Sequence, residues 1–183
     1  MENAREISAT KIRQAITDFL TNFPFFASLN SKELDVVSNY ISFYEVDAGT
    51  VLFNEGQEAD CVYFIVEGEL DVIKETVGGK KVGIDRVVIA TLSKGSTIGE
   101  MSVIEDSPRS ATVRAKATVI LVTLSREGFR IILDQHPHIG IKILIGLAQA
   151  LSRNLRKTSG RLADYTMNDA KDPMAFKEMK IGA

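Results

Sequence analysis

The sequence has few of the residues from which disulfide, redox and metal sites are built. Its 183 residues include one cysteine, Cys61, and two histidines, His136 and His138. One cysteine excludes an internal disulfide bond and any multi-cysteine zinc or iron–sulfur site. The two histidines flank a proline, where we expect residues of a helix junction rather than metal ligands.

Motifs for covalent chemistry are also missing. The sequence contains no P-loop, no GxGxxG, no HExxH, and no serine or cysteine nucleophile with a histidine placed to activate it. Cys61 falls in a predicted buried strand, where a thiol is an inert core residue. The sequence therefore predicts a protein that is not an enzyme and that uses no cofactor.

Neither a surplus of one charge nor a long apolar run is present. Lys and Arg number 22 against 24 Asp and Glu, which gives a net charge of −2 and argues against a nucleic-acid partner. The most apolar run, residues 139–151, is interrupted by Lys142 and Gln149 and is too short to span a bilayer. The first six residues, MENARE, lack the apolar core of a signal peptide. We expect a soluble, cytoplasmic protein.

The spacing of apolar residues changes along the chain, from a helical period to the alternation of strands and back. Residues 1–22 show helical spacing of apolar residues, and Asn30 with Glu33 forms a capping-box pattern before a short second helix. Residues 40–124 are short β-branched and aromatic runs between glycine turns, which indicates an all-β barrel or sandwich. At Glu67-Gly68 two of these runs meet with hardly any loop, so we expect a kink there.

Helical spacing returns after residue 124. Ser125 is placed to cap a helix that Pro137 ends, and a longer helix is expected over residues 138–160, with Gly160 as its stop. One stripe of this helix is expected to pack on the β-structure, and a second apolar side is left for a homodimer or an effector protein. The stripe comprises Ile143, Leu147, Leu151 and Leu155, and the second side Ile141, Ile145 and Ala148. Residues 161–183 are expected to form a polar, partly disordered tail.

The most informative stretch is IGEMSVIEDSPRSA, residues 98–111. A strand is expected to end at Gly99 and a single helical turn to follow, so that backbone N–H groups suit a phosphate. Arg109 offers a planar fork of donors for two phosphate oxygens. Glu100 is out of place beside an anion unless it accepts hydrogen bonds from sugar hydroxyls. These features together describe a site for a ribose phosphate.

The same stretch resembles the phosphate-binding cassette of the cyclic nucleotide-binding domain family. That pattern is (Phe/Ile)-Gly-Glu-(Leu/Met)-(Ala/Ser)-Leu-(Leu/Ile), a short gap, then Pro-Arg-(Ser/Thr/Ala)-Ala. FPFFASL at 23–29, VDAGTVLFNEG at 46–56 and YFIVEGEL at 63–70 are similar to other family segments. The resemblance covers about residues 19–158. It implies an eight-stranded antiparallel β-roll, jelly-roll-like, with N-terminal helices and two C-terminal helices. The implied domain comprises residues 23–160, in which the roll spans 40–124 and the C-terminal helices span 126–160.

The resemblance also implies roles for particular residues. Glu100 would accept the ribose 2′-hydroxyl, Arg109 would pair with the cyclic phosphate, and Ser110 would complete the phosphate cradle. The implied binding positions are Gly99, Glu100, Met101, Ser102, Arg109, Ser110 and Ala111. The alternative to a binding site is a purely structural role, in which Glu100 and Arg109 pair with each other across a tight turn.

The identity of the base is harder to predict. In the family, a serine or alanine after the cassette arginine accompanies cAMP and a threonine cGMP, so Ser110 favours cAMP, although its hydroxyl suits a guanine as well. Residues that would line the base are Val51, Val62, Val88 or Ile89 from the roll and Gln149, Ser152, Arg153 or Arg156 from the helix. For each of these helix residues, a solvated helix face is the simpler interpretation.

Three functional hypotheses follow. The leading one is a stand-alone, non-enzymatic cyclic nucleotide sensor whose C-terminal helix moves on binding. A truncated relative of a cAMP-responsive transcription regulator is the second, but residues 161–183 are too few for a helix-turn-helix domain, so DNA binding is not expected. The third is a ligand-free β-roll that serves interaction or dimerisation.

Overall fold

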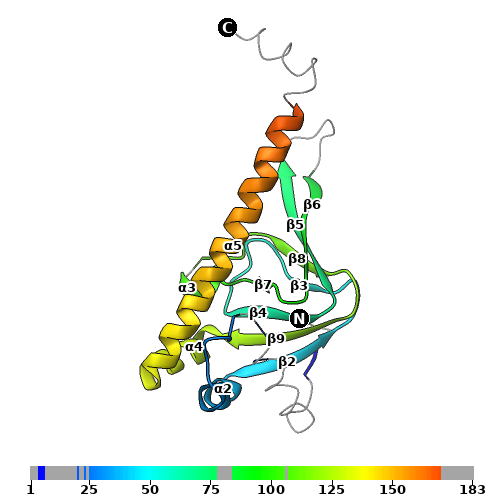
Figure 1. Cartoon of the computed structure of the whole chain (residues 1–183). Coiled ribbons are helices and arrows are strands. Elements are labelled where there is room, and N and C mark those ends of the chain that lie inside the picture. The colour runs from blue at the N-terminus through cyan, green and yellow to red at the C-terminus, as the bar shows by residue number, and fades with distance from the viewer. Residues whose placement is uncertain are drawn as a thin grey trace. The chain divides into compact units, whose positions relative to one another are not determined.

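The structure is a computed structural model that describes residues 4–6, 20, 23, 25–77, 84–105 and 107–169. Its strands are β1 (Ala4–Glu6), β2 (Ile41–Val46), β3 (Val51–Phe53), β4 (Cys61–Glu67), β5 (Glu69–Val77), β6 (Ile84–Ser93), β7 (Thr97–Ile98), β8 (Thr112–Ala115) and β9 (Val119–Ser125). Its helices are α2 (Ser31–Ser38), α3 (Met101–Ile104), α4 (Arg126–Gln135) and α5 (Pro137–Asp169) (Figure 1).

The strands form two antiparallel sheets. One sheet has the order β1-β2-β9-β4-β7 and the other the order β3-β8-β5-β6. Strands β2 to β9 contribute four strands to each sheet, which confirms the mainly β, eight-stranded antiparallel roll with flanking helices. Strand β1 adds a fifth strand at the edge, paired with β2.

The chain passes from one sheet to the other at a single glycine. Strand β4 ends at Glu67 and β5 begins at Glu69, so only Gly68 lies between them. Gly68 has φ +88°, a left-handed conformation that favours glycine. A Cβ at this position would lie 2.5 Å from the carbonyl oxygen of Thr118. The kink predicted at Glu67-Gly68 is confirmed, and both backbone conformation and space require glycine there.

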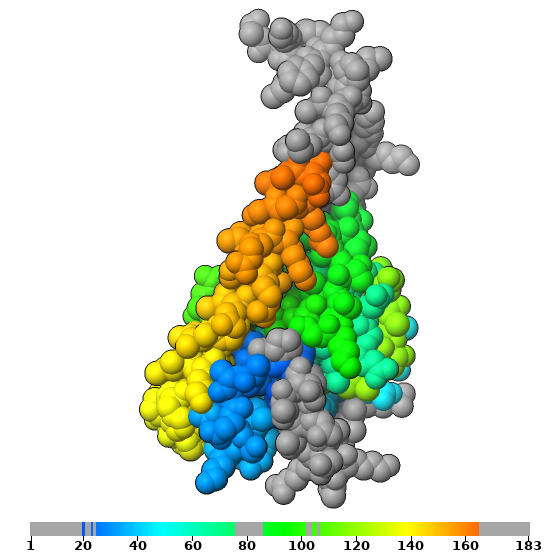
Figure 2. Space-filling view, in the orientation of Figure 1, coloured from blue at the N-terminus to red at the C-terminus, as the bar shows by residue number. Residues whose placement is uncertain are grey.

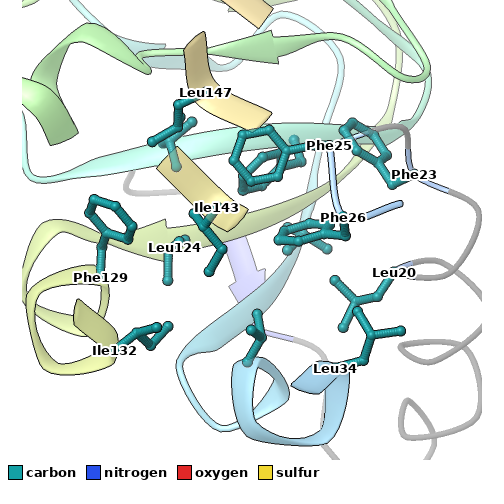
Figure 3. Close-up of a cluster of buried hydrophobic side chains, with 14 of the residues drawn as sticks. Leu20, Phe23, Phe25, Phe26, Leu34, Leu124, Phe129, Ile132, Ile143 and Leu147 are labelled. Atoms are coloured by element: carbon teal, nitrogen blue, oxygen red, sulfur yellow. The ribbon is translucent and has the colours of Figure 1, made fainter. Parts of the chain in front are cut away.

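Two hydrophobic cores lie on the two faces of the larger sheet. Because successive side chains of a strand point to opposite faces, β4 contributes Val62 and Phe64 to one core and Cys61, Tyr63 and Ile65 to the other. The helix-side core packs four phenylalanines of the N-terminal region and β4 against α4 and α5 (Figure 3). The second core fills the interior of the roll.

The helix boundaries follow local signals in the sequence. The side chain of Asn30 accepts a hydrogen bond from the Glu33 amide at 3.1 Å, and the Glu33 carboxylate accepts one from the Asn30 amide at 2.8 Å. Ser125 caps α4 by accepting from the Gly128 amide at 2.9 Å. Both predicted caps are confirmed, and each satisfies backbone N–H groups that a helix start leaves unpaired.

Helix α5 belongs to two compact units, residues 1–147 and 148–183. In the first unit Ile143 and Leu147 are fully buried, whereas Ile141 and Ile145 are about half exposed, at 55% and 52%. The second apolar side predicted for this helix is therefore present, whereas Leu155, predicted for the packing stripe, is 68% exposed. Lys142 lies between the two sides and binds the Glu33 carboxylate at 2.7 Å, which joins the start of α5 to α2. Figure 2 shows the first turns of α5, in yellow, beside the blue N-terminal part of the chain.

Two expectations about the ends of the chain are wrong where the structure tests them. Residues 4–6 form β1 rather than helix; Leu20 is helical, but most of residues 7–22 lie outside the described residues. Helix α5 continues past Gly160 to Asp169, so Gly160 is not its stop. An added Cβ at Gly160 would meet nothing within 4 Å, and an exposed glycine inside a helix costs only about 1 kcal/mol relative to alanine. The remainder of the expected polar tail, 170–183, lies outside the described residues.

Candidate functional site

The stretch singled out in the sequence connects β7 of one sheet to β8 of the other. Gly99 follows β7 directly, and α3 is the single helical turn that was predicted after it. The chain then returns through Arg109 to β8, which starts at Thr112. The segment thus crosses between the sheets, and its residues lie against both of them.

Arg109 is the buried cation of this segment, with 5% of its surface exposed. Its Nη2 donates to the carbonyl oxygen of Cys61 at 2.9 Å, and its Nη1 lies 3.5 Å from the carbonyl oxygen of Gly99. The guanidinium carbon is 4.2 Å from the ring centroid of Phe53 and 5.4 Å from that of Tyr63. A buried charge needs such compensation, because transfer out of water otherwise costs several kcal/mol.

Gly99 makes the position of Arg109 possible. It has φ +78°, and an added Cβ would overlap the guanidinium of Arg109 and approach the carbonyl oxygen of Cys61 to 3.2 Å. In the structure, the arginine already occupies the space that a side chain would need.

The backbone of Arg109 is fixed to the turn between β3 and β4. Its amide donates to the carbonyl oxygen of Gln57 at 2.9 Å, and its carbonyl accepts from the amide of Gly56 at 2.8 Å. Nearby, the amide of Glu55 donates to the Thr112 hydroxyl at 2.9 Å. These contacts hold both the backbone and the side chain of the arginine within the roll.

The other residues predicted for the site are differently placed. Glu100 is buried, with 6% of its surface exposed, and it precedes α3. Met101 is 47% exposed, Ser110 is exposed and Ala111 is buried. Ser102 lies in α3, but its side chain is outside the described residues. The structure thus brings the backbone of Gly99 and the side chain of Arg109 together and leaves the Ser110 side chain at the surface.

Sequence reasoning missed the surroundings of the arginine. Phe53, Tyr63 and the carbonyl group of Cys61 are all more than 40 residues before Arg109 in the chain. The alternation of β4 carries a signal for one of them, since Tyr63 shares the inward face with Cys61. We had assigned Cys61 to the core as an inert residue. Burial raises the pKa of its thiol to about 11, which is consistent with that interpretation.

Of the candidates for a base contact, one from the roll is wrong. Val62 is fully buried in the helix-side core, on the opposite face of β4 from Tyr63. Val51, Val88 and Ile89 are exposed, at 39%, 49% and 49%. The four helix candidates, Gln149, Ser152, Arg153 and Arg156, belong to the second unit.

The two histidines lie at the junction between α4 and α5. His136 caps the end of α4, and Nε2 of His138 is 3.8 Å from the Glu33 carboxylate. Within the described part of the chain, no three His, Cys, Asp or Glu side chains come together as a metal site would require. None of the described helices is both long and apolar enough to cross a membrane.

The sequence model of one family, described as the cyclic nucleotide-binding domain, matches residues 44–136. The match covers just over half of the chain and includes the segment around Arg109. The chain belongs to the cyclic nucleotide-binding domain family. The roll, the crossing segment and the buried arginine described above are therefore features of a member of that family.

Relatives and solved structures agree with this assignment. The cAMP-dependent protein kinase regulatory subunit of Yarrowia lipolytica is 32% identical over 125 residues, which are 68% of this chain and 31% of that protein. A cyclic nucleotide-binding domain from Methylobacillus flagellatus superposes with a TM-score of 0.76 at 28% identity, covering 90% of each chain. The regulatory domain of Toxoplasma gondii PKA, solved with cAMP, gives a TM-score of 0.57 at 28% identity, covering 69% of this chain and 46% of that one. The chain spans only about a third of the curated relative.

Proposed function

We propose that this chain is a regulatory sensor that binds a cyclic nucleotide, cAMP rather than cGMP, in a domain of residues 23–160. The observation that carries the proposal is Arg109, a planar cation held inside the roll by contacts from both sheets. A cyclic phosphate presents two exocyclic oxygens and one negative charge, and the fork of a guanidinium matches such a pair of oxygens.

The neighbouring residues supply the remaining contacts of the proposed site. Glu100 is a buried carboxylate one residue after Gly99 and offers an acceptor for the ribose 2′-hydroxyl. Ser110 carries an exposed hydroxyl directly after Arg109 and offers a contact to the phosphate. The co-crystal structure of the regulatory domain of Toxoplasma gondii PKA with cAMP supports this choice of nucleotide, as does a serine rather than a threonine at position 110.

Titration calorimetry with cAMP, cGMP and linear 5′-AMP tests the proposal. We expect cAMP to bind in the low-micromolar range or tighter. Removing one partner of a desolvated charge pair costs about 2–5 kcal/mol, so Arg109→Ala should weaken binding at least ~25-fold. The matched control is Arg114→Ala, an exposed arginine on β8, which should bind like the wild type. Equal affinities for wild type and Arg109→Ala, or no binding of any cyclic nucleotide, would refute the site.

We expect the chain itself to leave the nucleotide chemically unchanged, as befits a regulatory domain. The thiol of Cys61 is buried, and its raised pKa keeps it protonated, so it is a poor nucleophile. The sample recovered after the cAMP titration, supplied with magnesium or manganese, should contain only intact cAMP. Protein-dependent formation of 5′-AMP would contradict this part of the proposal.

The proposed output is a change in the C-terminal helix. Its outer side in the first unit exposes Ile141, Leu144 and Ile145, and such a side suits a second copy of the chain or an effector protein. A ligand shifts this helix only by contacting one arrangement better than another. Hydrogen exchange with cAMP should therefore show protection at residues 99–110 and also beyond Ile139. Protection confined to residues 99–110 would refute the coupling. The molecular mass of the protein in solution distinguishes a dimer from a monomer whose partner is an effector protein.

A second candidate function is an interaction module without a ligand. The observation that favours it is that Arg109 already binds the carbonyl group of Cys61 and stacks on Phe53, so that a structural role also accounts for its burial. The calorimetric titration decides between the two functions. A module of this kind would bind no cyclic nucleotide and would lose stability, rather than affinity, in Arg109→Ala.

A further inference from the structure

We propose that Phe53 and Tyr63 are positioning residues for Arg109, forming an aromatic seat that sets the affinity for the cyclic phosphate. This inference rests on the proposed function and concerns how the same site is organised. The seat is defined as the two rings, whose centroids are 5.6 Å apart with planes inclined by 32°. Both side chains are buried, with 5% and 4% of their surfaces exposed.

The seat is built by both sheets. Phe53 ends β3 and pairs with Val113 of β8, whereas Tyr63 lies on β4 and pairs with Ile98 of β7, next to Gly99. The guanidinium carbon lies 4.2 Å from one ring centroid and 5.4 Å from the other. Both distances fall within the range at which an arginine is attracted to an aromatic ring.

A break in the regular strand pairing turns Phe53 inward. The register between β3 and β8 shifts between Val51 and Phe53, and the consecutive side chains of Leu52 and Phe53 are both buried while Val51 is exposed. In an unbroken strand the position after a buried Leu52 would face outward. Bulges re-aim side chains and are frequent beside binding sites, so the backbone itself is shaped to place this ring.

Stacking suits an arginine that must also bind an anion. The guanidinium carbon lies over the Phe53 ring, while hydrogen bonds to phosphate oxygens are made by the N–H groups at the edge of the guanidinium. A hydrophobic residue of similar size would fill the same volume but would not attract the cation. The rings therefore hold the guanidinium in place before a ligand arrives, which lowers the ordering cost of binding.

The test compares cAMP affinities of ring-deleting and ring-preserving variants. Phe53→Leu should weaken binding about 5- to 25-fold, on the scale of a desolvated cation–π contact. Tyr63→Leu should weaken it less, because its ring is farther away, and Tyr63→Phe should bind within about twofold of the wild type since the ring remains. Phe53→Met serves as a second ring deletion if Phe53→Leu does not fold.

The matched control is Phe64→Leu. Phe64 is fully buried and adjacent to Tyr63, but it points into the helix-side core on the opposite face of β4. Its variant should lose thermal stability to at least the same extent as Phe53→Leu while keeping the wild-type affinity. This separates positioning of the arginine from general loosening of the roll.

A double-mutant cycle shows whether the ring acts through the arginine. In the Arg109→Ala background, Phe53→Leu should change cAMP affinity by less than about twofold, because its partner is gone. An equal loss in both backgrounds would overturn the inference, and so would wild-type affinity in Phe53→Leu; in either case the proposed function would stand. If the wild type binds no cyclic nucleotide, the proposed function fails and this inference with it.

Discussion

Replacing Gly99 by alanine is the sharpest test of how the roll holds its buried cation. Two effects contribute, a strained backbone and a steric overlap. An alanine at φ +78° costs about 1–2 kcal/mol, because its Cβ crowds the neighbouring carbonyl oxygen in the left-handed region. The Cβ would also occupy the place of the Arg109 guanidinium, and displacing this group breaks hydrogen bonds of a charged side chain worth about 1.5–3 kcal/mol.

The chain offers a control that separates the two effects. Gly95 has φ +83°, but a Cβ there would meet nothing within 4 Å. Gly95→Ala should therefore show the backbone strain alone and keep the wild-type affinity for cAMP. Gly99→Ala should lose about 2 kcal/mol more than Gly95→Ala, a further fall in Tm of roughly 4–8 °C for a chain of this size.

Urea denaturation measures the stability of both variants, and calorimetry measures their affinity for cAMP. Gly99→Ala should bind at least about tenfold more weakly than the wild type, because the displaced guanidinium no longer offers its edge at the same place. Identical stability and affinity for the two alanine variants would refute the reasoning. Such a result would mean that Arg109 relaxes at no cost and that its observed position is not required.

Two further predictions concern ionisable groups outside the crossing segment. Hydrogen bonding to Lys142 and to the Asn30 amide lowers the pKa of Glu33 below its ordinary 4.5, so the stability that Glu33 contributes is present above pH 4.5 and is lost as the pH falls through the lowered value. Glu33→Gln should thus be less stable than the wild type by up to about 1 kcal/mol at pH 7. Urea titrations should show the two stabilities converging as the pH falls below the lowered pKa of Glu33, and a difference that stays constant with pH would contradict the ion pair. The thiol of Cys61, with a pKa of about 11, should react with iodoacetamide at pH 8 only after unfolding, and rapid labelling of the native protein would show that it is accessible and ionised.

The sequence was sufficient for features that depend on neighbouring residues. The Asn30–Glu33 capping box and the Ser125 cap operate over three positions, and the glycine kink at Gly68 needs only its own backbone angle and a close approach. The alternating runs of residues 40–124 predicted the roll because one face of each strand must be buried. These signals are local in the sequence, although the close approach that also requires glycine at position 68 is to Thr118, fifty residues away.

What the sequence did not predict depends on contacts between distant residues. The surroundings of Arg109 bring together Phe53 of one sheet and Cys61 and Tyr63 of the other, which meet only when the two sheets have closed. The inward turn of Phe53 arises from a register shift that involves its partner strand β8. An alternating pattern read along β3 alone would place that ring on the wrong face. The continuation of α5 through Gly160 was missed for a different reason, since glycine is a weak helix breaker.

The two kinds of contact that Arg109 makes have opposite consequences for binding. The carbonyl oxygens of Cys61 and Gly99 lie at the Nη groups of Arg109. A phosphate oxygen that takes the same N–H as one of them must displace it, and the affinity is then the difference between the two sets of hydrogen bonds. The contacts with the rings of Phe53 and Tyr63 use none of the N–H donors of the guanidinium, so they do not compete with a ligand. The rings therefore contribute to affinity by keeping the arginine ordered before a ligand binds, whereas the carbonyl groups stabilise only the free arrangement. A ligand that displaces Arg109 from the carbonyl oxygen of Cys61 therefore changes the hydrogen bonding of β4, because that oxygen belongs to the first residue of the strand.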